Sequence, residues 1–557
     1  MTRLRWWPAA VVVAGGVLWL GYIWFVSPGI RQDRNVRSIL ATAVTGILLL
    51  LWFLLASGLR WKTRLAGFGL VVAALVLLAG LFRIEGVSGD LVPILAYRWS
   101  ARPGSASGPV SASTDSSPAV TEAPPSPGPI AGASVTPESS GPTPPVPGSP
   151  APTLSDAAPV SAIPSADYPQ FLGPTRDAVL PGPRLARDWS ARPPRLLWRQ
   201  PIGAGWSAFA VVGGLAVTQE QHGDDEQIVA YEARSGRVRW RHSDRTRYDT
   251  VIAGVGPRAT PTIRDGRVFA MGATGILNAL RLDNGERLWS HRVLEDNGSS
   301  NLSWGTSGSP LVDGDRVVVS AGGREGRSLV AYRADTGEPL WATGHDRQGY
   351  SSATIATLAG RRQILVFNGG SVAGHDASTG ALLWEQPWPA EQPNVAQPLP
   401  LSGDRVLFSA GYGVGSKLYQ IGAMPDGSLS ATLVWESPRL KAKFANMFVH
   451  DGFVYGLDDG VFTCLDLKDG QRKWRAGRYG HGQAILVGGL FLIETENGEV
   501  VLVEPSPQGL QELTRFTAFE GKTWNPPALA GNRLYVRTDR EASAFELPLE
   551  QVLEREP

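Results

Sequence analysis

The sequence has a single cysteine, Cys464, among its 557 residues. An intrachain disulfide therefore cannot form, and neither a cysteine-based zinc cluster nor a CxxC redox motif can be built. The seven histidines show no HxH or HExxH spacing, which is the spacing that histidine metal sites need. We therefore predict no metal site, and no residue is singled out as catalytic.

An excess of charge of either sign is also missing. The 52 Lys and Arg residues nearly balance the 51 Asp and Glu residues, for a formal net charge of +1, and no basic stripe stands out. Binding to nucleic acid depends on clustered positive charge that neutralises phosphates. We therefore expect no nucleic-acid partner.

Long uncharged runs, in contrast, are present near the N-terminus, over residues 6–26, 38–59 and 65–82. Each has roughly the 20 apolar residues that cross about 30 Å of hydrocarbon. We predict three transmembrane helices and interpret residues 1–100 as a membrane anchor, because no ionisable residue inside the runs marks a transport path. The alternative, a cleaved signal peptide in the first run, lacks a small-x-small cleavage site and is followed by two further runs.

Residues 101–165 contain 16 prolines and no aromatic residue. Such a composition cannot bury enough apolar surface to offset chain entropy, so we predict a disordered linker. As a flexible coil it spans about 45 Å. A PxxP partner site is the alternative to a plain spacer.

A glycine-to-tryptophan hairpin repeats through the rest of the chain. The segment "RADTGEPLW" ends at Trp341, and closely similar segments are "EARSGRVRW", "RLDNGERLW", "DASTGALLW" and "DLKDGQRKW". Asp or Asn before Gly suits the positive φ of a tight hairpin turn. The marker aromatics lie 39 to 52 residues apart and are Trp198, Trp240, Trp289, Trp341, Trp384, Trp435, Trp474 and Phe516.

Four strands in each repeat of 40–50 residues are typical of a propeller blade. The strand around Trp198 has no blade before it, and the C-terminal part supplies only three strands after Phe516. We therefore predict an all-β eight-bladed propeller over residues 166–557, in which the N-terminal strand completes the last four-stranded antiparallel blade. The tryptophan of each hairpin is predicted to dock its blade against the neighbouring one.

The repeats "AYRADTGEPLW", "AYEARSGRVRW" and "CLDLKDGQRKW" resemble the pyrroloquinoline quinone (PQQ)-like repeat, and the segment "DYPQFLGPTRDAVLPGP" is similar to the start of such propellers. The resemblance covers roughly residues 167–547 and implies the propeller fold. One branch of the family comprises quinoprotein dehydrogenases, which bind PQQ and calcium in the central funnel. Another is the outer-membrane β-barrel assembly lipoprotein, which binds no quinone and docks proteins.

The dehydrogenase branch implies a vicinal cysteine pair, calcium ligands and an aspartate base. Cys464 stands alone, and no segment matches those ligands. No cofactor is therefore expected, although PQQ with calcium stays possible. The scaffold branch carries a lipidated cysteine where this chain has three apolar runs.

Loops that lead from the outer strand of one blade to the inner strand of the next converge on one face of a propeller. We expect them to form a ligand-binding mouth at the central channel, where cations could hold an anion and indole rings could stack on a planar group. The alternative is that these polar groups only satisfy channel water and loop backbone. The residues predicted at the mouth are Trp206, Arg258, Asn301, Trp304, Tyr350, Asn394, Gln397, Lys443, Asn446, His481, Trp524 and Asn525.

Three other motifs are interpreted as structural. "GYGVGSK" (411–417) lacks the Gly-Lys-Ser/Thr ending of a phosphate loop and is predicted to be a hairpin. "GTSGS" (305–309) does not have the glycine spacing of a nucleophile elbow, and "HGDDEQ" (222–227) is predicted to be a solvated connection between strands.

The leading hypothesis is a membrane-anchored, extracytoplasmic propeller that acts as a non-catalytic scaffold for a protein partner at the cell envelope or for a ligand. Lys and Arg favour a cytoplasmic N-terminus by only five to four. We expect the helices in the bacterial inner membrane and the propeller in the periplasm. The alternatives are a PQQ-dependent membrane-bound dehydrogenase that passes electrons to the quinone pool, and a ligand-sensing ectodomain.

Overall fold

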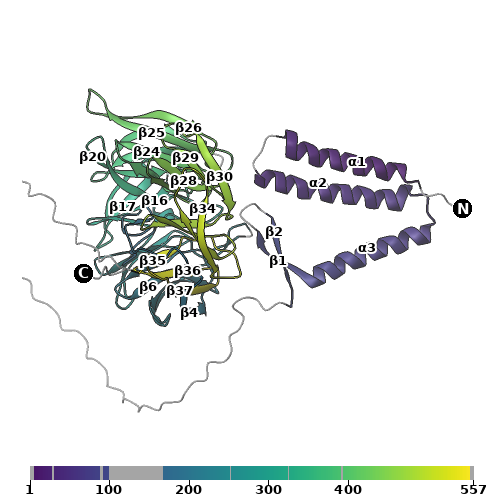
Figure 1. The fold of residues 1–557 in the computed structure, drawn as a ribbon, viewed down its shortest axis with the longest axis horizontal. Helices are drawn as coiled ribbons and strands as arrows, with labels where there is room; N and C mark the ends of the chain where they lie inside the picture. The colour runs from purple at the N-terminus through teal and green to yellow at the C-terminus, as the bar shows by residue number, and fades with distance from the viewer. Residues whose placement is uncertain are drawn as a thin grey trace, which may run out of the picture. The chain divides into compact units, whose positions relative to one another are not determined.

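The computed structural model describes residues 5–27, 31–87, 92–99, 167–250, 252–323, 325–389 and 393–551 (Figure 1). The predicted linker, 101–165, lies outside these residues.

Three N-terminal helices are long and apolar enough to cross a membrane, over Trp7–Val26, Asp33–Ala56 and Trp61–Leu81. Helix α1 (Trp7–Gly21) and helix α2 (Arg31–Leu51) each end in a π-helical turn, at Tyr22–Val26 and Trp52–Ala56, and α3 is Trp61–Leu81. Helix α2 begins at Arg31 rather than near 38, and α3 at Trp61 rather than near 65. In both helices charged residues precede the apolar run and belong to the first turns of the helix, because Arg and Lys are good helix formers.

A hairpin that the sequence did not predict follows α3 directly. Strand β1 (Phe82–Val87) pairs with β2 (Pro93–Tyr97) in antiparallel register. The rings of Phe82 and Tyr97 lie 4.7 Å apart at the open end of the hairpin.

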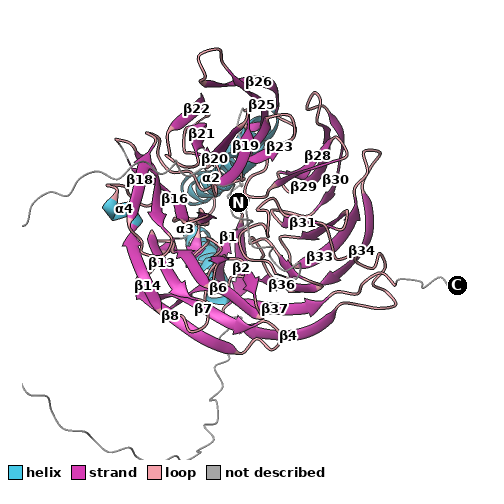
Figure 2. Cartoon of the chain, turned by 90° about the vertical axis from the view of Figure 1, so that its left-hand side faces the viewer, coloured by secondary structure: helices cyan, strands magenta, loops and turns pink. Residues whose placement is uncertain are grey.

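The described residues after 166 form eight blades of four antiparallel strands, which Figure 2 shows arranged around a ring, and the short strand β3 (Val179–Leu180) adds a fifth, parallel strand to the sheet of blade 7. Blades 1 to 4 are β5–β8 (Ala210–Val212, Leu215–His222, Asp225–Glu232, Val238–Arg245), β11–β14 (Thr262–Arg264, Arg267–Met271, Ile276–Arg281, Arg287–Arg292), β15–β18 (Leu311–Asp313, Arg316–Gly323, Arg327–Arg333, Pro339–Thr343) and β19–β22 (Thr354–Leu358, Arg361–Phe367, Ser371–Asp376, Leu382–Pro387).

Blades 5 to 7 are β23–β26 (Leu399–Leu401, Arg405–Ala410, Gly415–Ala423, Leu429–Ser437), β27–β30 (Met447–His450, Phe453–Asp458, Val461–Asp466, Arg472–Arg478) and β31–β34 (Gln483–Val487, Leu490–Glu494, Glu499–Glu504, Gln511–Thr517). Blade 8 combines β35–β37 (Ala528–Ala530, Arg533–Arg537, Glu541–Glu546) with the N-terminal β4 (Arg195–Pro201). The short elements β9 (Asp249–Thr250), β10 (Gly254–Val255) and α4 (Val293–Asp296) lie in loops between blades.

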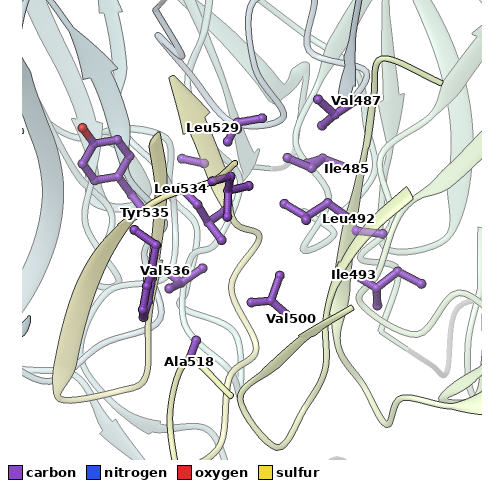
Figure 3. Packing of buried hydrophobic residues seen from close by; sticks show 14 of the residues in the cluster. Ile485, Val487, Leu492, Ile493, Val500, Ala518, Leu529, Leu534, Tyr535 and Val536 are labelled. Atoms are coloured by element: carbon purple, nitrogen blue, oxygen red, sulfur yellow. The ribbon is translucent and has the colours of Figure 1, made fainter. Parts of the chain in front are cut away.

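Alternate side chains of a strand face opposite neighbours, so every blade is buried on both faces. In β12, Val268 packs in a cluster with blade 1, and Phe269 and Met271 pack with blade 3. Figure 3 shows the largest cluster, where Leu529 and Leu534 of blade 8 lie near Ile485 and Leu492 of blade 7. This two-sided burial explains why a single repeat cannot stand alone.

Five of the repeated tryptophans dock their blade against a turn glycine of the next blade, as predicted. The indole of Trp289 lies on Gly337 in the turn of the next blade, and its Nε1 donates to the carbonyl of Ala334 (3.1 Å). A Cβ on that glycine would approach the ring to 2.7 Å, and its φ of +76° is one that glycine adopts freely. The same ring-on-glycine contact joins Trp198 to Gly236, Trp240 to Gly285, Trp341 to Gly380 and Trp435 to Gly470.

The junction between blades 4 and 5 differs. Trp384 donates within its own blade, to Oε1 of Gln363 (2.7 Å). The facing turn between β25 and β26 does not carry the repeat motif. Gln386 bridges the two blades instead, because its Nε2 donates to the carbonyl of Ala431 (2.9 Å) in β26.

Blade 8 closes the ring as the sequence predicted. Trp198 of β4 lies opposite Ala544 of β37. Arg537 of β36 is completely buried and donates to the carbonyls of Gly205 (3.0 Å) and Gln219 (3.1 Å), in the loop after β4 and in blade 1. Strand pairing and this guanidinium both tie the two ends of the propeller together.

Candidate functional site: an aromatic cup at the axis

The segment before β4 reaches blades on several sides of the ring. This axial segment, 167–180, pairs Tyr168 with Val211 of blade 1 and places the carbonyl of Pro169 against the amide of Ile263 (2.7 Å) in blade 2. Its last residues form β3 (Val179–Leu180), which runs parallel to β31 of blade 7. The axial segment therefore fills part of the centre that the sequence had suggested as an open channel.

Arg176 fixes the axial segment in place. Its guanidinium donates to the carbonyls of Ser309 (2.7 Å), Pro310 (3.1 Å) and Ala353 (2.9 Å), which belong to the loops that enter blades 3 and 4. Gln397, before blade 5, donates its side-chain amide to the carbonyl of Arg176. Burial lowers the pKa of Arg176 to about 9, so the group stays charged at neutral pH and its five N–H donors need these carbonyls.

A cavity of about 160 Å³ lies among the loops that lead from blade to blade. We call it the axial cup. Seven of the eighteen residues that line it are aromatic, and one of these rings comes from the axial segment. The aromatic residues that line it are Phe171, Trp206, Trp304, Tyr350, Tyr412, Phe444 and Trp524.

The rings of the cup form two groups. On one side the rings of Trp206 and Trp524 lie 4.8 Å apart, and Phe444 meets Trp524 edge-on at 5.5 Å. On the other side Trp304 and Tyr350 make an edge-on pair at 5.8 Å. Such contacts hold rings in fixed orientations, so the walls are preformed.

Two cations lie near the rings. The ammonium of Lys522 is 3.8 Å from the ring centre of Trp524 and 4.9 Å from that of Trp206, and burial lowers its pKa. Arg258 lines the cup, but its guanidinium donates to the carbonyls of Ala253 (2.6 Å), Gly254 (3.2 Å) and Gly256. Burial lowers the pKa of Arg258 to about 10, so its charge is retained and is used to hold its own loop.

Three carboxamides also line the cup, beside the hydroxyls of Ser307 and Ser352, and the hydrogen-bond partners of the carboxamides differ. The side-chain amide of Gln483 donates to the carbonyls of Phe444 (2.7 Å) and Trp524 (3.0 Å). Oδ1 of Asn446 accepts a hydrogen bond from the backbone N–H of Gln397 (3.0 Å). Asn525 is 2% exposed, and neither its Nδ2 nor its Oδ1 has a hydrogen-bond partner. One donor and one acceptor in the wall are thus left unmatched.

The structure brings together seven of the twelve residues predicted at the mouth. The ones that line the cup are Trp206, Arg258, Trp304, Tyr350, Asn446, Trp524 and Asn525. Of the other five, Asn301 and Asn394 donate to the carbonyls of Ala273 (2.8 Å) and Asn368 (2.7 Å), and Gln397 holds the axial segment. Nζ of Lys443 lies 3.5 Å from Nε2 of His481, and neither residue lines the cup.

Sequence reasoning missed three of the rings. Phe444 lies in a loop that was considered, but only its polar neighbours were chosen. Tyr412 belongs to the turn between β24 and β25, the predicted hairpin at 411–417, and turns between second and third strands reach the same face as the blade-to-blade loops. Phe171 precedes the first blade, so no repeat pattern could place it.

Comparisons with known proteins agree with this architecture. A protein-family model described as outer membrane protein assembly factor BamB matches residues 178–322 and 303–476, which together make up more than half of the chain. The chain belongs to this family. The match runs from the axial segment through blade 6.

Individual relatives are distant. The outer membrane protein assembly factor BamB of Burkholderia pseudomallei is 26% identical over 259 residues, which are 44% of this chain and 63% of that protein. The protein of the same description from Xanthomonas campestris pv. campestris is 29% identical over 123 residues, 22% of this chain and 28% of that protein. The chain therefore spans less than two thirds of the length of these relatives.

Among solved structures, the quinohemoprotein alcohol dehydrogenase from Comamonas testosteroni aligns with a TM-score of 0.50 at 13% identity, over 70% of this chain and 82% of that chain. At this identity the similarity shows the propeller fold alone.

The quinoprotein branch implies PQQ and calcium, and the lining of the cup does not fit that pair. Calcium takes six to eight oxygen ligands and favours carboxylates, whereas no Asp or Glu is among the described residues that line the cup. No group of three or more His, Cys, Asp or Glu residues within the described ranges could hold a metal ion. The guanidinium of Arg258, which could face an anionic quinone, already donates to loop carbonyls.

Proposed function

We propose that the protein is a membrane-tethered, non-catalytic binding scaffold of the cell envelope. In this proposal residues 1–100 anchor it in the bacterial inner membrane, 101–165 act as a linker, and 166–557 present the propeller in the periplasm. A protein partner docks at the axial cup.

The observation that carries the proposal is the chemistry of the cup wall. Seven aromatic rings and three carboxamides surround a preformed cavity together with Ser307 and Ser352, and the described residues of the lining include no carboxylate, histidine or cysteine to act as a base or metal ligand. Aromatic walls of this kind supply binding energy through contact area. The relatives described as outer membrane protein assembly factors support a polypeptide as the partner.

A site-specific photo-crosslink tests the docking site. A photoreactive amino acid replaces Ile252, a 37% exposed residue of the cup lining, in the full-length protein expressed in its native cells. The control position is Leu433, which is 45% exposed on the outer strand β26. We expect one discrete protein adduct from position 252 that is absent from position 433. Equal adduct patterns, or no adduct at 252, contradict docking at the cup.

The dehydrogenase alternative has its own test. Purified full-length protein is heated with and without saturating PQQ and calcium, because a ligand that binds the native state must raise its melting temperature. We expect no shift and no bound-quinone absorbance. A saturable shift with quinone absorbance supports the dehydrogenase and contradicts the non-catalytic scaffold.

A further inference from the structure

The size of the axial cup limits what enters it to one ring-sized group. Its volume of about 160 Å³ is close to the ~150 Å³ of an engineered apolar cavity that takes up one benzene ring. The rings of Trp206 and Trp524 on one side and of Trp304 and Tyr350 on the other give such a group apolar contacts on two sides. A larger occupant must leave most of its mass outside the cup.

The charges of the wall favour a neutral group. Arg258 is the one charged residue among the described residues that line the cup, and both of its terminal nitrogens already donate to carbonyls of residues 253–256. The ammonium of Lys522 lies against the rings of Trp524 and Trp206 but does not line the cup. An anion would have to draw the donors of Arg258 away from their loop, and a cation would find no carboxylate among the described lining residues. Burying an unpaired charge is costly, so an uncharged ring is preferred.

Asn525 adds a polar requirement. Its side chain lines the cup, is 2% exposed, and has neither a partner for its Nδ2 donor nor one for its Oδ1 acceptor. A buried polar group without a partner is unfavourable, and a ligand that satisfies it recovers that loss. A peptide unit offers one N–H and one C=O together, whereas a hydrocarbon chain offers neither.

Building on the scaffold function above, we propose that the cup binds an extended, uncharged peptide segment that inserts one aromatic side chain between the two ring groups and pairs an adjacent backbone amide with Asn525. The partner is thus a polypeptide with an exposed Phe-like residue in a neutral stretch. The rest of its chain lies outside the cup.

The test uses full-length protein in lipid nanodiscs and capped pentapeptides in isothermal titration. The parent probe is acetyl-Ala-Ala-Phe-Ala-Ala-amide, and its variants carry Ala or Lys in place of Phe, or an N-methyl group on the Phe nitrogen or on the next Ala nitrogen. We expect the Ala and Lys peptides to bind roughly tenfold or more weakly, because the ring contacts are lost. We expect one N-methyl peptide to bind about fivefold more weakly.

The substitution Asn525→Leu separates the amide contact from the ring contact. In this variant the parent and the N-methyl peptides should bind equally, while the preference for Phe over Ala remains. The matched control is Asn284→Leu, in an exposed turn between β13 and β14, which should behave as wild type. If Asn525→Leu and Asn284→Leu both lose the preference for Phe over Ala to the same extent, the assignment of the amide contact to Asn525 and of the ring contact to the cup is wrong.

The outcomes also separate this inference from the proposed function. If the peptides show no dependence on Phe, or a planar dianion such as naphthalene disulfonate binds more tightly than all of them, the peptide inference is wrong. An adduct from position 252 in cells would then still support the scaffold. If neither the peptides nor the crosslink shows binding, both proposals fail.

Discussion

The circumference of the propeller and its axis are built in different ways. Around the circumference one contact, an indole on a turn glycine of the next blade, occurs at five junctions. At the axis each contact occurs once, as Arg176 shows by holding carbonyls of residues 309, 310 and 353. Because the repeated contact stabilises the ring at several junctions, the loss of one such contact should lower the free energy of unfolding less than the loss of one axial contact.

Removal of the axial guanidinium should have the largest effect. Arg176→Met leaves the buried carbonyls of Ser309 and Ala353 without their donor, while the carbonyl of Pro310 keeps the hydroxyl of Thr262 (2.7 Å). We expect the free energy of unfolding to fall by about 3–5 kcal/mol. Urea unfolding of the full-length protein, followed by tryptophan fluorescence, measures it. The control is Arg187→Met, whose side chain is 45% exposed and pairs with Glu504, and we expect it to cost less than about 1 kcal/mol. Similar small losses in both would break the comparison.

A second unrepeated contact makes stability depend on pH. Burial raises the pKa of Glu226 in blade 1 from 4.5 to about 7, while its Oε2 accepts the amide of Ala273 (3.0 Å). The pKa of Glu226 is higher in the folded than in the unfolded protein, so the folded state holds the proton more tightly. The contribution of Glu226 to the free energy of unfolding is therefore complete below pH 4.5 and is lost as the pH rises to about 7. The loss amounts to about 3 kcal/mol.

Glu226→Gln, which keeps an oxygen acceptor, should remove this dependence. Unfolding titrations at a series of pH values, with wild type and variant compared at each, provide the measurement. Parallel pH profiles for the two proteins would exclude a neutral Glu226.

The repeated contact is probed by a pair of glycines. Gly337 (φ +76°) lies under Trp289, and Gly266 (φ +70°) has nothing within 4 Å of its Cβ position. Both alanine substitutions should pay about 1 kcal/mol for the positive φ. Gly337→Ala should cost a further 1–3 kcal/mol, roughly, for displacing the indole. Equal melting temperatures for the two variants would show that the indole of Trp289 moves away from a Cβ at residue 337 at no cost in stability.

The smallest effect should distinguish two of the tryptophans. Trp289→Phe removes a hydrogen bond to Ala334 in the next blade, whereas Trp384→Phe removes one to Gln363 in its own blade. Each bond contributes about 1 kcal/mol. Hydrogen exchange by mass spectrometry should show faster exchange in the 334–337 turn for Trp289→Phe. For Trp384→Phe, the change should stay within blade 4. Faster exchange in blade 5 for Trp384→Phe would contradict the difference between the junctions.

The parts of the fold that repeat were predictable from the sequence. Evenly spaced tryptophans and turn glycines predicted eight blades, and the unpaired strand at Trp198 predicted closure beside the C-terminal strands, which the pairing of Trp198 with Ala544 confirms. The three apolar helices were predicted from length and composition, although charged residues such as Arg31 hid the start of α2.

The parts that occur once were not predictable. Nothing periodic announces that Arg176 will bind loops more than a hundred residues away, or that Phe171 will join the cup wall. Among the predicted residues at the mouth, loop position was informative but side-chain direction was not, because Asn301 and Asn394 turn back to satisfy nearby carbonyls. That role depends on backbone groups which a sequence does not display.

Blade 8 also has a consequence for how the protein is made. Its outermost strand, β4, is synthesised before the other three strands of the blade, and its partner β37 is synthesised only after blades 1 to 7. Strand β4 therefore stays without its partner strand until blades 1 to 7 have been synthesised. A chain cut short before residue 541 lacks β37, so β4 has no strand to pair with and the ring of blades cannot close.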